Sequence, residues 1–362
     1  PDIAPEYVVF RGGFRDSPEW GSAYVLAPWM LYRRYGDRRA VERHYAGMRR
    51  YVDYLSGSAA GHIVSHGLGD WCDIGPGSPG ASKQTPQGVT ATAIYHHDLE
   101  TLAGAALLLG RPDDAARYEV IASGVRKAFN RIFFRADAGS YASGSQTSNA
   151  MPLALGIVDP RNRPRVLDHI VADVHSRGGA VTAGDVGLRF LLRALAEGGR
   201  SDVIYDMFTK TGTPSYGYQL RRGATALTEA WDANPALSQN HCMLGHAEEW
   251  FFEFLAGIAP APDCVGFDKI HIRPQFVPGL AWVRASHRSI RGDIHSYWRR
   301  EGNRVVLEVT LPHNTTSTIF VPARDRHSVQ ADGARFLRME GETAVFEAGG
   351  GSYRFAASGQ RR

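Results

Sequence analysis

The stretch GVTATAIYHHDLETLAGAALLLGRPDDAARYEVIASGVRKAFNRIFF, residues 88–134, decides the fold class. It predicts two helices, 88–110 and 111–134, because its apolar residues recur at helical spacing. The connection between them is so short that the two helices must run antiparallel as a hairpin. We therefore looked for further hairpins on both sides of this one.

Four more helical pairs are predicted within the first 260 residues. Loops rich in glycine, proline and aromatic residues follow the hairpins on alternate connections, so they gather at one end, as in a toroid with a pocket. A solenoid is disfavoured because the hairpins share no fixed period. A closed ring of six hairpins needs twelve helices, so we expect an incomplete ring with an exposed apolar flank on 22–57. The ten predicted helices span 22–36, 37–57, 88–110, 111–134, 145–158, 159–178, 185–199, 201–211, 223–231 and 234–258.

The composition changes near residue 262. From there the chain shows short alternating segments bounded by turn residues, such as FDKIHIRP, RVVLEVTLPHN and TTSTIFVPA. This pattern predicts antiparallel strands in a sandwich of about 100 residues. We therefore expect two domains, a helical domain over 1–261 and a β-sandwich over 262–362, with the second acting as a stabilising cap.

Charge and hydropathy exclude several kinds of partner. The 362 residues carry a net charge of +4 without a run of five like charges, so nucleic acid is a poor candidate. No apolar run reaches the length of a membrane span, so no membrane partner is expected. The chain does not begin with methionine, so a cytoplasmic, periplasmic or secreted location stays open. A homo-oligomer is also possible.

Nothing in the sequence predicts a metal or a cofactor. The three cysteines are widely spaced and form neither a disulfide framework nor a CxxC site. Phosphate-binding, nucleophile-elbow, dinucleotide and HExxH motifs are absent, and HAEEW at 246–250 has the wrong spacing for zinc.

Acidic residues instead accompany aromatic residues in the loops GDWCDIG, EAWD and PEWGSA. Sugar chemistry needs this mixture, because carboxylates bind hydroxyls or act as acid and base while flat rings stack on a pyranose. The competing interpretation is a set of helix caps and core tryptophans. The candidates are Asp70, Trp71, Asp73, Glu229, Trp231, Glu19 and Trp20.

Glu229 is the strongest catalytic candidate among them. Small residues precede it, Trp231 follows it, and the segment leads into the apolar stretch CMLGHAEEWFFEFLAGI. A glutamate in such surroundings is partly desolvated and available as a base.

Several long segments, in order, resemble the catalytic domain of bacterial α-L-rhamnosidases, glycoside hydrolase family 78. They are GDWCDIGPGSPGASKQTPQGVTATAIYHHDL, SQTSNAMPLALGIV, TAGDVGLRFL, YGYQLRRGATALTEAWD and SQNHCMLGHAEEWFFEFLAGI. The following part, from FDKIHIRP to LPHNTTSTIFVPA, is similar to the C-terminal β domain of that family.

This resemblance implies an (α/α)6 barrel, hydrolysis with inversion and no organic cofactor. It places the general base at Glu229 and a sugar contact at His241. It also places Asp70 and Trp71 in the sugar pocket, and Trp20 near the start of the barrel. Asp73 and Trp231 are candidates from loop chemistry.

One departure from the family pattern concerns the general acid. In the family this glutamate lies upstream of the PDIAP-like segment with which this chain begins. We therefore expect the chain alone to bind L-rhamnose weakly and to favour activated aryl rhamnosides, unless Asp73 or Glu19 serves as the acid.

Three functions stay open at this point. The first is a hydrolase that releases terminal non-reducing α-L-rhamnose from a glycoside or oligosaccharide. The second is a carbohydrate-binding pseudoenzyme that keeps the pocket. The third is a related barrel enzyme acting on uronates, in which Arg221 or Arg222 would pair with the substrate carboxylate.

Overall fold

The computed structural model describes residues 16–358, which form two compact units. The first unit takes in the chain up to Trp29 together with Arg38–Ala247, and the second takes in Met30–Asp37 and Glu248 onward. The sequence-based boundary at 261/262 instead placed 30–37 and 248–261 in the helical part.

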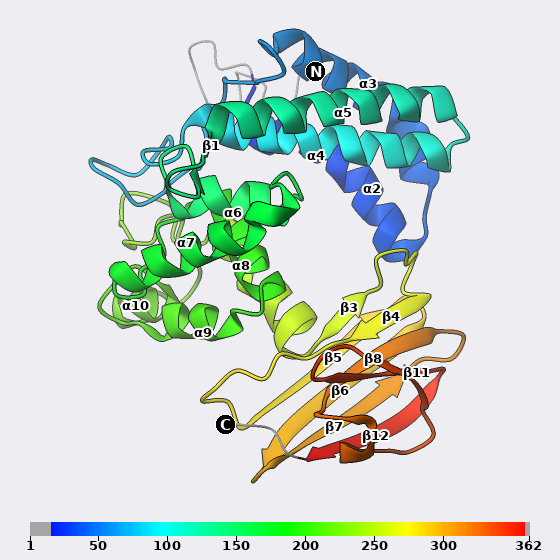
Figure 1. The fold of residues 1–362 in the computed structure, drawn as a ribbon. Helices are drawn as coiled ribbons and strands as arrows, with labels where there is room; N and C mark the ends of the chain where they lie inside the picture. Colours follow the sequence, from blue (N-terminus) through cyan, green and yellow to red (C-terminus); the bar gives the residue numbers. More distant parts are fainter. Residues whose placement is uncertain (1–15, 359–362) are drawn as a thin grey trace. The chain divides into compact units, whose positions relative to one another are not determined.

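The first unit is helical, as the sequence predicts (Figure 1). Eight of the ten predicted helices, those between residues 22 and 211, are present with shifted ends. The elements in this part of the chain are α1 (Pro18–Gly21), α2 (Ala23–Tyr35), α3 (Arg39–Ser58), α4 (Gln87–Leu108), α5 (Pro112–Phe133), β1 (Phe134–Arg135), β2 (Ser140–Tyr141), α6 (Gln146–Ala154), η1 (Pro160–Asn162), α7 (Arg163–Ser176), α8 (Gly187–Glu197), α9 (Ser201–Thr209), α10 (Tyr216–Arg221) and η2 (Cys242–Leu244).

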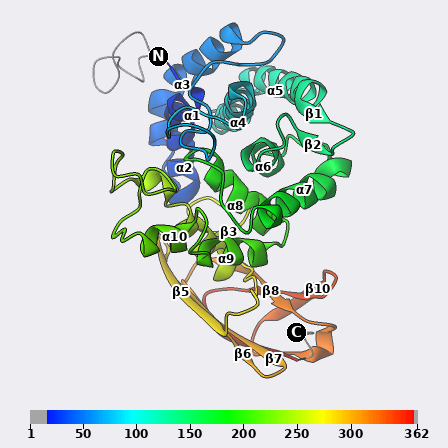
Figure 2. The same cartoon turned by 90° about the vertical axis from the view of Figure 1, so that its left-hand side faces the viewer.

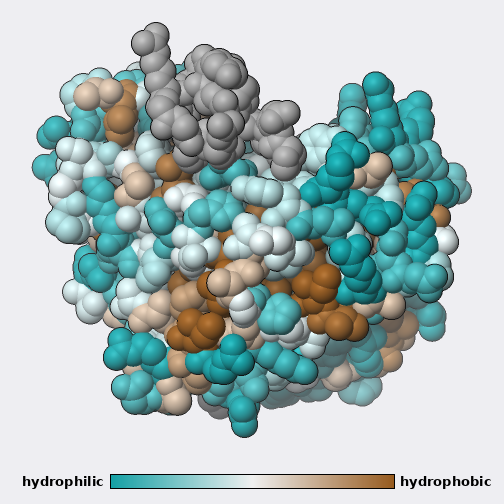
Figure 3. Space-filling model, turned by 90° about the horizontal axis from the view of Figure 1, so that it is seen from above, coloured by the Kyte–Doolittle hydropathy of each residue, from teal (hydrophilic) through white to brown (hydrophobic). Residues whose placement is uncertain are grey.

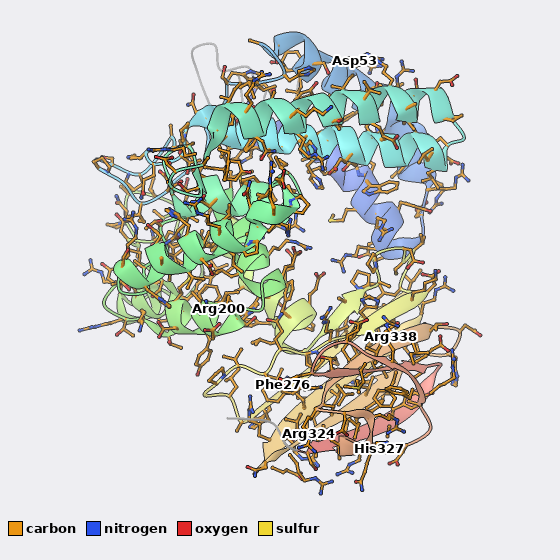
Figure 4. All side chains as sticks on the ribbon, in the orientation of Figure 1. Asp53, Arg200, Phe276, Arg324, His327 and Arg338 are labelled. Carbon is orange, nitrogen blue, oxygen red and sulfur yellow. The ribbon has the colours of Figure 1, made fainter. Side chains whose placement is uncertain are left out.

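The predicted hairpin of α4 and α5 is confirmed, and the two helices lie side by side (Figure 1). Most residues of α4 are buried, which is the pattern of a helix packed on all sides, whereas α5 buries one stripe and exposes the other. Arg117 of α5 also donates to Asp53 of α3 at 2.9 Å, and Figure 4 labels Asp53. The hairpin is therefore tied to the preceding helix by packing and by an exposed ion pair.

Helix α6 contacts α4, α7 and α8, and Figure 2 shows these helices around it. The side chain of Ser145 caps its N-terminus by accepting from the backbone N–H of Ser148 at 3.1 Å. A buried α6 brings the loops on both sides of it into one region of the unit.

The fifth predicted hairpin, 223–231 with 234–258, is wrong. Residues 222–241 form turns, because Asp232 and Asn234 bond backbone N–H groups two residues on and so compete with a helix. The stretch 242–255 is divided into η2, a short α11 (Ala247–Glu249) and a π-helix, η3 (Trp250–Leu255). The long segment is therefore a loop that carries Glu229, and not a helix.

The second unit is mainly β, and the strands expected between 268 and 358 are present. They form two five-stranded sheets with the orders β10-β11-β8-β4-β3 and β5-β6-β7-β12-β9. Every named pair is antiparallel except β4 with β8. The bounds are β3 (Ile258–Pro260), β4 (Lys269–Ile272), β5 (Trp282–Ser289), β6 (Gly292–Glu301), β7 (Arg304–Leu311), β8 (Thr316–Pro322), η4 (Arg326–Ser328), β9 (Val329–Ala331), β10 (Arg335–Met339), β11 (Thr343–Ala348) and β12 (Gly351–Ser358).

One apolar core lies between the two sheets, which makes the unit a sandwich. Phe346 of β11 and Phe355 of β12 belong to different sheets, yet their ring centroids are 5.1 Å apart. Trp298 is fully buried in the same core and lies 4.8 Å from the ring of Phe276, which Figure 4 labels. The predicted β-sandwich is confirmed.

Residues 30–37 join this unit through specific contacts. Arg34 forms an ion pair with Glu253 at 2.7 Å, and Gly266 donates to the carbonyl of Arg33 at 2.9 Å. These contacts explain why the last turns of α2 belong with the strands although they continue a helix of the first unit.

The surface seen from above is largely hydrophilic, with one gathering of hydrophobic side chains (Figure 3). The expectation of an exposed apolar flank on 22–57 agrees with α2, where Tyr24, Met30, Leu31 and Tyr35 are exposed. Within residues 16–358, no helix has the length and apolar composition needed to cross a membrane.

Candidate active site

Glu229 lies in the turn-rich loop and is held at both of its carboxylate oxygens. The indole N–H of Trp71 donates to Oε1 at 3.1 Å, and the backbone N–H of Ser238 donates to Oε2 at 3.2 Å. The backbone N–H of Glu229 in turn donates to the carbonyl of Ser238 at 3.0 Å. The side chain is half-buried, so it is fixed in direction and still within reach of water.

Asp70 is fully buried and all its hydrogen bonds are internal. It accepts from Thr147 at 2.5 Å, from the N–H of Gly184 at 2.9 Å and from the N–H of Gly187 at 2.7 Å. Gly187 is the first residue of α8, so Asp70 caps that helix from a remote loop. These bonds join the loop of Asp70 to α6 and α8, and the sugar contact predicted for Asp70 stays a prediction.

Trp231 and Asp73 are likewise engaged in structural contacts. Trp231 is fully buried and its indole N–H donates to the carbonyl of Ala183 at 2.7 Å, so its ring has no face open to a sugar. Asp73 accepts from the backbone N–H groups of Lys83 and Gln84, both at 2.8 Å. Both residues stabilise the loops that carry the site, and their predicted sugar binding stays a prediction.

His241 lies beside the Glu229 loop. Its backbone N–H donates to Leu227 at 2.8 Å, and its imidazole Nε2 lies 3.8 Å from the carboxylate of Asp185. The side chain of His241 is 29% exposed, so this residue is accessible to a ligand.

Asp185 is the residue that sequence reasoning missed. It precedes α8, its backbone N–H donates to the carbonyl of Trp71 at 2.8 Å, and its side chain is buried. Burial raises the pKa of Asp185 to about 8, and the nearby charges of Asp70 and Glu229 add to the shift. The segment TAGDVG repeats the Gly-Asp pair of GDW, which was the available signal.

Glu19 and Trp20 lie on α1. Glu19 accepts from Ser17 and Thr90, both at 2.5 Å, and burial raises its pKa to about 7. Trp20 is half-buried, and in the described part of the chain it is not joined to the hydrogen-bonded group around Glu229. A pKa near neutrality suits a proton donor, but the contacts of Glu19 do not lead to Glu229.

Two surface hollows lie away from this cluster. One, of ≈ 750 Å³, lies on the outer face of the sheet β5-β6-β7-β12-β9. The other, of ≈ 760 Å³, lies beside the end of α5. Neither is lined by Glu229, Trp71, Asp185 or His241. Arg221 and Arg222, on which the uronate alternative depended, are exposed where α10 ends.

The described residues, 16–358, contain no group of three or more His, Cys, Asp or Glu side chains that could hold a metal ion. The groups that the cluster around Glu229 offers are carboxylates, an imidazole and an indole N–H. A carboxylate fixed at both oxygens and still partly exposed can take a proton from a water molecule.

The buried acids predict that stability falls as pH rises from about 6.5 to 8.5. The folded pKa values of Glu19 and Asp185, about 7 and about 8, lie above their ordinary values, and burial also raises that of Asp98. Their stabilising contribution is complete at low pH and is lost as pH rises through the folded pKa. Burial lowers the pKa values of His96 and His97 to about 4, so these residues act oppositely, but their effect is nearly complete about one pH unit above the ordinary histidine pKa.

Urea unfolding of the chain at pH 6.5, 7.5 and 8.5 measures this slope. Asp185→Asn should reduce it, because asparagine does not titrate. A free energy of unfolding that stays constant or rises over this interval would contradict the assignment.

Comparison with known proteins identifies the two parts of the chain. Residues 1–255 match the model of the bacterial alpha-L-rhamnosidase 6-hairpin glycosidase domain, and residues 257–335 match the bacterial alpha-L-rhamnosidase C-terminal domain. An alpha-L-rhamnosidase of Streptomyces avermitilis is 31% identical over 98% of this chain and 34% of that protein. Another, from Formosa agariphila, is 27% identical over 93% of this chain and 37% of that protein.

Solved structures agree with these matches. The alpha-L-rhamnosidase of Dictyoglumus thermophilum superimposes with a TM-score of 0.89 at 30% identity, covering 98% of this chain and 41% of that one. The Streptomyces avermitilis alpha-L-rhamnosidase complexed with L-rhamnose gives a TM-score of 0.86 at 31% identity, covering 94% and 33%. This chain thus spans about a third of the length of the curated relatives it matches.

Proposed function

The chain belongs to the bacterial alpha-L-rhamnosidase six-hairpin glycosidase family, and from that premise we propose that it hydrolyses terminal non-reducing α-L-rhamnosides with inversion. Glu229 is the general base in this proposal. The observation that supports it is a pair of hydrogen bonds, from Trp71 and Ser238, to the two oxygens of the half-buried Glu229 carboxylate.

An inverting hydrolase needs a base that activates water on the face of the sugar opposite the leaving group. The two hydrogen bonds to Glu229 hold its carboxylate in one orientation, which lowers the entropic cost of aligning water with the anomeric carbon. The side chain stays half-buried, so a water molecule can reach the carboxylate.

The remaining residues have distinct roles. Trp71 lies half-buried beside the base and His241 is accessible, so both can contact the rhamnosyl group. Asp70, Asp73 and Trp231 hold the loops that present them. The proposed substrate is a rhamnose-containing glycoside or oligosaccharide. None of the acids described around Glu229 is assigned as the proton donor, so the activity is tested on aryl rhamnosides, whose phenolate leaves without taking up a proton.

The stereochemistry of the product tests the mechanism. With 4-nitrophenyl α-L-rhamnoside, the first sugar released should be β-L-rhamnose, because water attacks opposite the departing group. Proton NMR within the first minutes resolves the two anomers before mutarotation mixes them. α-L-Rhamnose as the first product would reject inversion, while no release from aryl or flavonoid rhamnosides would reject hydrolysis by this chain.

A further inference from the structure

The carboxylate of Asp185 is the polar group of this site that the proposed mechanism has not used. It is 1% exposed, and neither of its oxygens has a hydrogen-bond partner among the described residues. Burial without a partner favours the protonated form of Asp185 in the free site, so a hydrogen-bond donor that approaches would stabilise its carboxylate form.

The backbone of Asp185 cannot move to find that donor. Its N–H is bonded to Trp71, and Asp70 holds Gly184 and Gly187 on either side of it. Even a Cβ on Gly184 would lie 2.1 Å from the carbonyl oxygen of Trp71, so the two loops already touch. Any partner must therefore come to Asp185.

His241 is the group placed to do so. Its Nε2 is 3.8 Å from Asp185 Oδ2, about 1 Å beyond a normal hydrogen bond. The backbone of His241 is fixed to Leu227, but its partly exposed ring can turn. A small rotation of the ring closes the gap and satisfies the buried carboxylate.

We propose that Asp185 is a positioning residue that accepts the Nε2–H of His241 when a sugar occupies the site and so fixes the imidazole beside the rhamnosyl group. This inference rests on the proposed function. With Nε2 protonated toward Asp185, Nδ1 faces away and accepts a hydrogen bond from a sugar hydroxyl. Neither the sequence motifs nor the comparisons assign a role to Asp185.

The surrounding charges fit this arrangement. The charged groups that act on Asp185 are acidic: Asp70 from the loop that carries Trp71, and Glu229 from the turn-rich loop. An imidazole donor offsets that accumulation of negative charge. Replacing Asp185 therefore should make protonation of His241 less favourable.

NMR titration of the His241 ring with saturating L-rhamnose present tests the coupling without any turnover. The signal is assigned by its loss in His241→Gln. In Asp185→Asn the pKa of the imidazole should fall by about one unit, a tenfold weaker proton affinity. Asp98→Asn is the matched control, because Asp98 is also a fully buried acid but bonds Ser22, between α1 and α2. A shift below about 0.2 units in Asp185→Asn, or an equal shift in the control, would overturn the proposal.

The tautomer of His241 in the unmodified chain gives a second test that does not depend on how a variant folds. With L-rhamnose bound at neutral pH, the nitrogen-15 shifts should show the proton on Nε2. A proton on Nδ1 in the complex would exclude the Nε2–H···Asp185 bond.

A double-mutant cycle in enzyme kinetics then tests whether Asp185 and His241 act together in catalysis. Asp185→Asn should lower kcat/KM for an aryl rhamnoside about 10- to 100-fold, yet less than about twofold in a His241→Gln background. Equal effects in both backgrounds would overturn the proposal. Absence of hydrolysis with an intact titration shift would instead count against the proposed function and leave the pair standing.

Discussion

Glu229→Gln lowers kcat for an aryl α-L-rhamnoside by about 10²–10⁴-fold, the usual loss when a general base is removed. Glutamine keeps the volume of the side chain and its Oε1 still accepts the indole N–H of Trp71. Its neutral amide is too weak a base to take a proton from water. Initial rates at saturating substrate measure the effect, and a largely unchanged KM would place the loss in the chemical step.

Asp232→Asn is the matched control for this experiment. Asp232 lies three residues away in the same loop and is exposed, so the same acid-to-amide change should alter kcat less than about threefold. Far-UV circular dichroism and a binding titration with L-rhamnose verify that both variants fold and bind. Near-normal turnover in a folded Glu229→Gln chain would sink the assignment of the base.

Trp231→Ala lowers the free energy of unfolding of the helical unit by about 3–5 kcal/mol, the cost typical of deleting a buried tryptophan. Trp231 has no exposed surface, its ring packs against Tyr216 at 5.2 Å, and its N–H satisfies Ala183. The substitution leaves a cavity and an unpaired carbonyl. Because Trp231 anchors the Glu229 loop to the segment that carries Asp185, rhamnose affinity should fall with stability.

Urea unfolding measures this loss, and Trp231→Phe separates its two parts. Phenylalanine retains most of the packing and removes the hydrogen bond, so it should cost less than alanine. Trp282→Ala is the surface control, since Trp282 is 60% exposed and should change stability by less than about 1 kcal/mol. A Trp231→Ala chain as stable as this control would refute the structural role.

The sequence alone was enough to predict most of the individual helices and strands. The period of apolar residues reports which side of a segment is buried, so eight helices and the main strands could be predicted from it. It failed at residues 223–258, where a helix-like composition folds into turns and a π-helix. There the side chains of Glu229 and Trp231 bond groups far away in the chain, and these long-range bonds outweigh local propensity.

The motifs also predict Glu229, Trp71 and His241 as site residues. In the structure the indole N–H of Trp71 donates to the carboxylate of Glu229. Their catalytic roles remain proposals. The motifs do not distinguish acidic residues that face a ligand from acidic residues that hold loops together. Asp70 and Asp73 come from the same glycine-rich loop as Trp71, yet both are taken up by internal hydrogen bonds.

The tertiary structure decided that difference through two Gly-Asp pairs of similar appearance. In GDW, Asp70 meets the N-terminus of α8 and Thr147, so its charge is satisfied by groups 77 or more residues away. In GDV, Asp185 is buried beside Glu229 and His241 with no hydrogen-bond partner in the described chain. A sequence pattern shows which side chains are present and how far apart they lie along the chain. Whether a buried carboxylate is satisfied depends on donors supplied by other segments, and only the packing of those segments determines it.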